Sequence, residues 1–250
     1  MKIKLIFIIL ILCILFSGCA VMNTSILETA ETVKPGHPKI GYELCKALDL
    51  TSTVFLKGDS SGTFTNHKLL GLPVEGIKFG FGIMNNLELN AKLWYTISGT
   101  GLKFYLKYRV NDNTNKLIMA ILPGFSFVNS ETDKEGDDSK IFNISDWFPK
   151  VKTIGGELPI VISYQTSKVL ILYGAARYSV DYIETQFPSG SLLSNLSDNY
   201  ILHRFGIIAG LSLKLGYLYL RPEAGLECAK QINGDFGILP VFGGGIGFEF

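Results

Sequence analysis

The feature that most constrains the fold is a strict two-residue alternation of apolar and polar side chains. From residue 102 to residue 110 the even positions are all apolar or aromatic, whereas the odd positions carry three cations and Tyr105. Successive side chains of a β-strand point to opposite faces of the sheet. The pattern therefore predicts a strand with one apolar face and one charged face, and no comparable helical period occurs after residue 38.

Ten segments share this alternation, and each is about as long as a transmembrane β-strand. They lie near 39–48, 74–83, 87–96, 101–110, 116–127, 152–165, 168–180, 201–214, 216–228 and 237–250. Their connections alternate in length. The short ones are 84–86, 111–115, 166–167 and the residues around Leu215, and the generally longer ones are 49–73, 97–100, 129–151, 181–200 and 229–236. We therefore expect an all-β fold, an antiparallel up-and-down transmembrane β-barrel of about ten strands, with short periplasmic turns and longer outer loops.

Over residues 38–250 this pattern resembles the bacterial outer-membrane β-barrel family. The chain ends Phe248-Glu249-Phe250, which resembles the terminal aromatic signal of that family. The resemblance implies two partners, the lipids of the outer membrane and the barrel-insertion machinery, which would recognise the last strand through Phe250. Tyrosines near the strand ends, Tyr95, Tyr164, Tyr182 and Tyr217 among them, are typical of aromatic girdles at the two membrane interfaces.

The first eighteen residues have the pattern of a signal peptide, with Lys2 and Lys4 before an apolar run. Ser17-Gly18-Cys19 resembles the bacterial lipobox, which implies cleavage before Cys19 and a lipid on that residue. We therefore expect a signal peptide at 1–18, a polar, lipidated tether at 19–37 and the barrel domain at 38–250. Ala20 does not match the retention residue of inner-membrane lipoproteins. We expect a protein of the bacterial outer membrane, anchored through Cys19 on the periplasmic side.

Charge argues against a nucleic-acid binder. The chain has 23 Lys and Arg against 22 Asp and Glu, and loss of Lys2 and Lys4 leaves 21 against 22, whereas nucleic-acid binders are basic. We expect no cofactor and no metal site. Cys45 and Cys228 lie on strands that are not predicted neighbours, so they are expected to be small apolar residues, with a disulfide as the alternative.

The charged faces of the strands are expected to line the barrel lumen. Nine residues define this set: Glu88, Lys92, Lys103, Lys107, Arg109, Arg177, Arg204, Arg221 and Glu223. Such side chains either pair with one another and fill a narrow interior, or line a small polar pore or ligand cavity. The sequence leaves both possibilities open.

No pattern of catalytic residues stands out. A histidine and a serine on adjacent strands suit a lipid-modifying enzyme, but His203 and Ser179 fall on opposite faces, beyond hydrogen-bond reach. We expect a non-enzymatic outer-membrane barrel with a structural, passive small-solute transport or surface-binding role. Two alternatives remain: an outer-membrane lipid-modifying hydrolase or acyltransferase, and a periplasmic lipoprotein that carries an apolar ligand in a soluble barrel, with the apolar faces turned inward.

Overall fold

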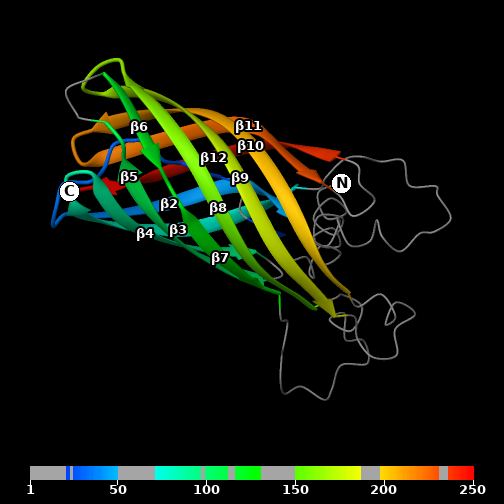
Figure 1. Ribbon diagram of the computed structural model, residues 1–250. Coiled ribbons are helices and arrows are strands. Elements are labelled where there is room, and N and C mark those ends of the chain that lie inside the picture. The colour runs from blue at the N-terminus through cyan, green and yellow to red at the C-terminus, as the bar shows by residue number, and fades with distance from the viewer. Residues whose placement is uncertain are drawn as a thin grey trace, which may run out of the picture.

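The computed structural model describes residues 21–22, 25–49, 71–96, 99–111, 116–130, 150–186, 198–230 and 236–250. These residues form one antiparallel β-sheet (Figure 1). Its strands are β1 (Val21–Met22), β2 (Pro38–Asp49), β3 (Gly71–Met84), β4 (Leu87–Thr96), β5 (Gly99–Arg109), β6 (Leu117–Ile121), β7 (Gly124–Asn129), β8 (Lys150–Gln165), β9 (Leu170–Gln186), β10 (Asp198–Leu215), β11 (Leu218–Lys230) and β12 (Phe236–Glu249).

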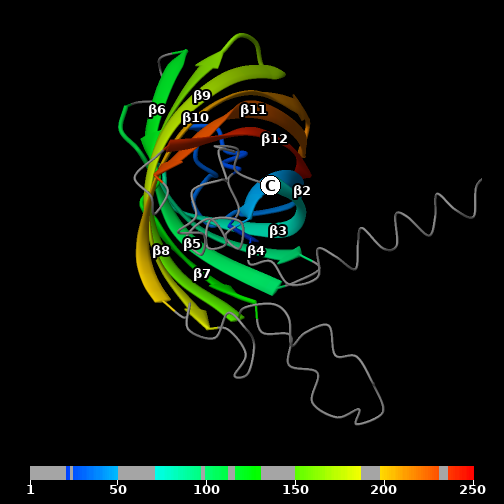
Figure 2. The same ribbon diagram turned by 90° about the vertical axis from the view of Figure 1, so that its right-hand side faces the viewer.

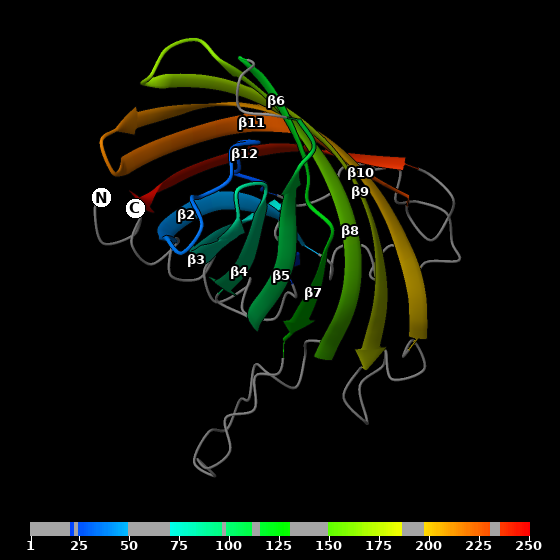
Figure 3. The ribbon, with the colours of Figure 1, turned by 60° about the vertical axis from the view of Figure 1, so that its left-hand side comes forward.

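The sheet closes on itself. β12 pairs with β2, from Gly243 opposite Cys45 to Glu249 opposite Lys39, and the two strands lie side by side in Figure 3. β6 and β7 together make one barrel strand, because both pair with β5 and β8 in a continuous register. The interruption falls at Pro123, which has no N–H to donate to the ladder. The barrel thus has ten strands, and the sequence prediction of a ten-stranded antiparallel barrel is confirmed.

The apolar faces of the strands point away from the lumen. Large apolar side chains are exposed on every barrel strand, and Ile207 in the middle of β10 is 72% exposed. Soluble proteins rarely present a continuous apolar surface of this extent to water. The alternative of a soluble barrel with its apolar faces turned inward is therefore wrong for this chain.

The two ends of the barrel differ in their connections. Short links join β3 to β4, β5 to β6, β8 to β9 and β10 to β11 at one end, here called the turn end. At the opposite loop end the links are 50–70, 97–98, 130–149, 187–197 and 231–235, most of them outside the described residues. The turn after β10 uses Gly216 at φ +66°, a conformation that glycine adopts without steric cost. The links therefore alternate in length as the sequence pattern predicted, except that the two-residue link from β4 to β5 at the loop end is shorter than the seven-residue link from β5 to β6 at the turn end.

Candidate functional site: the occluded lumen

Residues 25–33, here called the luminal segment, lie inside the barrel. In Figure 2 the loop end faces the viewer, and the dark blue N-terminal chain is seen within the ring of strands. Ser25 to Ala30 are all buried, and so is Val33. Residues 19–37 are predicted from the sequence to form a tether, but the structure places nearly half of that range in the lumen. The lumen is therefore filled by the chain's own N-terminal segment.

The luminal segment runs from the loop end toward the turn end. Val21 and Met22 pair with Asp49 and Leu48, at the end of β2 that leads into residues 50–70. After the lumen, Lys34 to His37 form a turn closed by a 3.1 Å hydrogen bond from the His37 N–H to the Lys34 carbonyl. Pro35 and Gly36 suit the two central positions of a type II turn, and Gly36 has the positive φ, +78°, that the second of these positions requires. This turn reverses the chain into β2.

Glu28 is the centre of the luminal contacts, and its side chain is fully buried. Its carboxylate lies 3.0 Å from the Lys39 and Lys78 ammonium groups, 2.8 Å from that of Lys107 and 3.7 Å from the Arg221 guanidinium. The Tyr105 hydroxyl donates a further hydrogen bond of 2.8 Å. These partners come from β2, β3, β5 and β11. We call Glu28 and these partners the Glu28 cluster, together with four further residues of the wall, Glu43, Glu88, Lys92 and Glu223.

The backbone next to Glu28 is held as firmly as its side chain. The Glu223 carboxylate accepts the N–H groups of Ile26 at 3.0 Å and Leu27 at 2.7 Å. The Leu27 carbonyl accepts from Lys78 at 2.9 Å and from Arg221 at 3.4 Å. Leu27 has φ +47°, a left-handed conformation that is strained for a side chain of its size. Because surrounding contacts must sustain such a backbone, the wall fixes the conformation of the segment.

The luminal segment also has an apolar side. Ile26 and Ala30 pack in a cluster with inward-facing residues of β5, β6, β8, β9 and β10. The Ala30 N–H donates a 2.8 Å hydrogen bond to the Ser163 hydroxyl. Burial of Ile26 stabilises this arrangement by roughly 1.5–3 kcal/mol. Charged contacts on one side and apolar contacts on the other together explain why the segment sits in one place.

A second group of buried charges pairs without help from the luminal segment. Arg204 lies 2.6 Å from Asp181 and 2.8 Å from Glu227, and Glu227 also pairs with Arg177. Lys103 and Arg177 share Glu157. We call these six residues the wall cluster. Three cations face three carboxylates, so the wall cluster balances its own charge.

An apolar layer lies nearer the loop end. Its buried members come from every barrel strand except β5, and Trp94 is the largest of them. They are Cys45, Leu48, Val74, Trp94, Val128, Val151, Ile183, Leu202, Ala229 and Leu239. Trp94 packs over Gly101, where a Cβ would overlap the indole ring. These buried apolar side chains line the barrel interior on the loop-end side of the charged residues.

At the turn end a polar vestibule of about 610 Å³ opens beside the luminal segment. Glu31, Lys34, Arg109, Lys214 and Glu249 are among its lining residues. Lys214 pairs with Glu31 at 2.6 Å and with Glu249 at 3.2 Å. The vestibule therefore gives aqueous ions access to Glu31, in the part of the luminal segment nearest the turn end.

The structure places all nine predicted lumen residues on the buried inward face. Five of them belong to the Glu28 cluster or touch the segment: Glu88, Lys92, Lys107, Arg221 and Glu223. Lys103, Arg177 and Arg204 belong to the wall cluster, and Arg109 lines the vestibule. Sequence reasoning missed Glu28. Its signal is a carboxylate flanked by Ile26, Leu27 and Ala30, which is unusual for a solvated tether.

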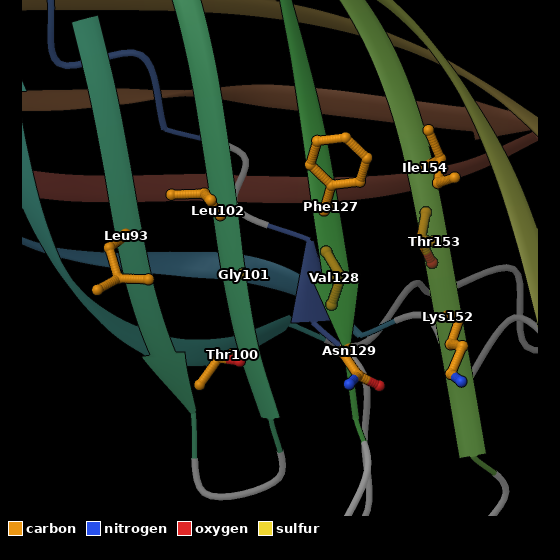
Figure 4. A pocket seen from close by; sticks show the side chains of 10 residues that line it. All are labelled: Leu93, Thr100, Gly101, Leu102, Phe127, Val128, Asn129, Lys152, Thr153 and Ile154. Carbon is orange, nitrogen blue, oxygen red and sulfur yellow. The ribbon is translucent and has the colours of Figure 1, made fainter.

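The outer surface carries shallow apolar grooves. Figure 4 shows one of about 490 Å³, where Leu93, Leu102, Phe127 and Ile154 point outward from β4, β5, β7 and β8. Thr100, Asn129 and Lys152 lie at its end nearer the loops. Such a groove suits a hydrocarbon chain and offers few polar groups to orient a soluble ligand.

The remaining sequence predictions fall in different places. His203 lies on the outward face, where its Nδ1 is 2.8 Å from the Tyr178 hydroxyl, whereas Ser179 is buried on the inward face. Cys45 and Cys228 are both free. Tyr95, Tyr164, Tyr182 and Tyr217 are exposed near strand ends, as the girdle pattern predicted. The signal peptide and Cys19 lie outside the described residues.

Within the described part of the chain, no helix is long and apolar enough to cross a membrane. The same residues contain no group of three or more His, Cys, Asp or Glu side chains placed to hold a metal ion.

No family model matches the sequence, and no curated protein matches it by sequence. Among solved structures, the chain is similar to the β domain of the Bordetella autotransporter BrkA, with 12% identity and a TM-score of 0.48 over 87% of this chain and 100% of that one. Neisserial surface protein A matches at 13% identity and a TM-score of 0.40, over 86% and 96% of the two chains. Ail of Yersinia pestis matches at 12% and 0.38, over 86% and 99%.

Proposed function

We propose that this chain is a non-enzymatic β-barrel of the bacterial outer membrane whose lumen is closed, and that it has a structural or surface-binding role carried by its outer loops. The observation that carries the proposal is the combination of an apolar belt facing outward with a luminal segment that fills the interior. The belt suits acyl chains, and the exposed tyrosines near both ends suit the membrane interfaces. Short turns then face the periplasm and the longer loops face the cell exterior.

The filled lumen argues against passive small-solute transport in the state described. The Glu28 cluster and the apolar layer occupy the interior at successive depths. An open pore would need a continuous aqueous path, as in the larger porins. Loops on a rigid scaffold can vary without disturbing it, which suits surface binding.

A liposome-swelling assay tests the closed lumen. Proteoliposomes with the full-length protein should swell in small sugars no faster than empty liposomes, while a general porin in parallel should give rapid swelling. The heat-modifiable folded band on a gel confirms that the reconstituted protein is folded. Swelling at the porin rate by folded protein would overturn the proposal of a closed barrel and restore passive transport.

The lipid expected on Cys19 forms a second part of the proposal. Val21 lies at the loop end, and two residues of chain span at most about 7 Å. A lipid on Cys19 would then lie on the same side of the membrane as the outer loops. This differs from the periplasmic position expected from sequence, because the chain passes through the lumen before β2 begins.

Epitope accessibility on intact cells tests the direction of threading. A short tag between Ala20 and Val21 should bind antibody on intact cells, as should a tag after Ser189 in the 187–197 loop. A tag between Asn85 and Asn86, in the turn from β3 to β4, should bind only after permeabilisation. If the tag before Val21 also required permeabilisation, the N-terminal chain would not emerge at the loop end.

A further inference from the structure

We propose that the barrel wall forms a binding site for an oxyanion, a carboxylate or a phosphate, and that Glu28 is the tethered occupant of this site. The proposal concerns the lumen alone, so it does not depend on a surface role for the loops.

Many donors surround the single carboxylate of Glu28. One Glu28 oxygen lies 3.0 Å from Lys39, 3.0 Å from Lys78 and 2.8 Å from the Tyr105 hydroxyl. The other lies 2.8 Å from Lys107 and 3.7 Å from Arg221. Four cations and a hydroxyl on four strands thus converge on one small volume. A single carboxylate or phosphate has the charge and the acceptor oxygens to fill it.

The charge balance of the wall also favours an anion at this position. Without the luminal segment, the wall of the Glu28 cluster presents five buried cations, Lys39, Lys78, Lys92, Lys107 and Arg221, against three buried carboxylates, Glu43, Glu88 and Glu223. At the rim, Glu249 is partly exposed and is shared between Arg221 and Lys214. The wall cluster, in contrast, has three cations and three carboxylates. The buried wall cations around Glu28 therefore exceed the buried wall carboxylates there by two, and buried cations without counter-charges are costly.

Glu28 follows a strained backbone position. Leu27, directly before it, has φ +47°, and its carbonyl is held by Lys78 and Arg221, two of the cations that bind Glu28. The local sequence does not favour this conformation. Contacts with the wall therefore hold the luminal segment in this conformation, as a binding site holds its ligand.

At the turn end, one side chain links the vestibule to the oxyanion site. The Glu31 carbonyl, beside the vestibule, accepts a 2.8 Å hydrogen bond from Lys107, which itself binds Glu28. Lys107 therefore joins the mouth of the vestibule to the oxyanion site.

Chemical rescue tests the proposal. Glu28→Ala removes the carboxylate and leaves space for a small acid. In chloride, we expect the unfolding midpoint of the full-length variant to fall by roughly 10 °C, because buried cations lose a partner. Acetate or phosphate at equal ionic strength should restore about half of that loss, with half-saturation in the millimolar range expected for a small ligand. Wild-type protein should show the same midpoint in all three salts.

Glu31→Ala is the matched control. Glu31 belongs to the same stretch of chain and is an acid, but its carboxylate pairs with one partly exposed cation, Lys214. The unfolding midpoint of Glu31→Ala should not depend on which anion is present. Equal responses of Glu28→Ala to chloride, acetate and phosphate would overturn the proposal, as would the same rescue in Glu31→Ala.

A second measurement keeps the proposal falsifiable if Glu28→Ala does not fold in chloride. Refolding of this variant into liposomes, read from the heat-modifiable band, should then recover in acetate or phosphate but not in chloride at equal ionic strength. A folded fraction that stays the same in all three salts would show that the wall does not bind oxyanions.

Discussion

Ile207→Arg measures whether the outward apolar belt faces lipid. Ile207 lies halfway along β10, is 72% exposed and sits on the outward face. In water an arginine at such an exposed position changes stability little. At the midplane of a bilayer it costs ~2–4 kcal/mol. Because every 1.4 kcal/mol is tenfold, we expect the folding equilibrium constant in liposomes to fall roughly 30- to 700-fold.

Leu215→Arg is the matched control on the same strand and face. Leu215 is 66% exposed and is the last residue of β10, eight positions from Ile207. That spacing is about 26 Å along the strand, which places Leu215 near the turn-end interface. There the same substitution should cost only ~0–1 kcal/mol.

The assay is urea-dependent folding into liposomes, followed by the heat-modifiable band and by tryptophan fluorescence. The reasoning predicts a large loss for Ile207→Arg and a small one for Leu215→Arg. Equal, small losses at both positions would refute the lipid-facing belt, because a water-facing surface tolerates arginine at either depth.

Three further predictions follow from individual residues. Gly101→Ala should destabilise the barrel by ~1–3 kcal/mol in urea unfolding, because the new Cβ overlaps the ring of Trp94. Gly156→Ala places its Cβ in open space and should cost far less. Equal costs for the two substitutions would contradict this packing. Removal of Phe250 should slow assembly in cells but leave refolding into liposomes nearly unchanged, if the insertion machinery reads the last residue. A clickable fatty acid should label wild-type cells and not a Cys19→Ala strain, and equal label would exclude lipidation.

The sequence predicted the strands because their faces repeat with the period of the backbone. Residues 102–110 already separate apolar from charged side chains, so β5 and its inward Lys103, Lys107 and Arg109 follow from local pattern alone. The alternation of short and long links likewise fixes antiparallel order. Alternation cannot say whether the apolar face turns inward or outward, because both arrangements have the same period. Only closure of β12 on β2, with the charged faces enclosed, decided that question.

The luminal segment shows what the sequence alone could not determine. Residues 25–33 have no strand period, and their polar residues resemble those of an exposed tether. Glu28 is buried because Lys39, Lys78, Lys107 and Arg221 meet around it. Lys39 lies on the first barrel strand and Arg221 on the last but one, so these cations become neighbours only when ten strands close into a ring. Local residue pattern thus determined the strands and their faces, whereas tertiary closure created the charged cavity that turns this stretch of chain into a plug.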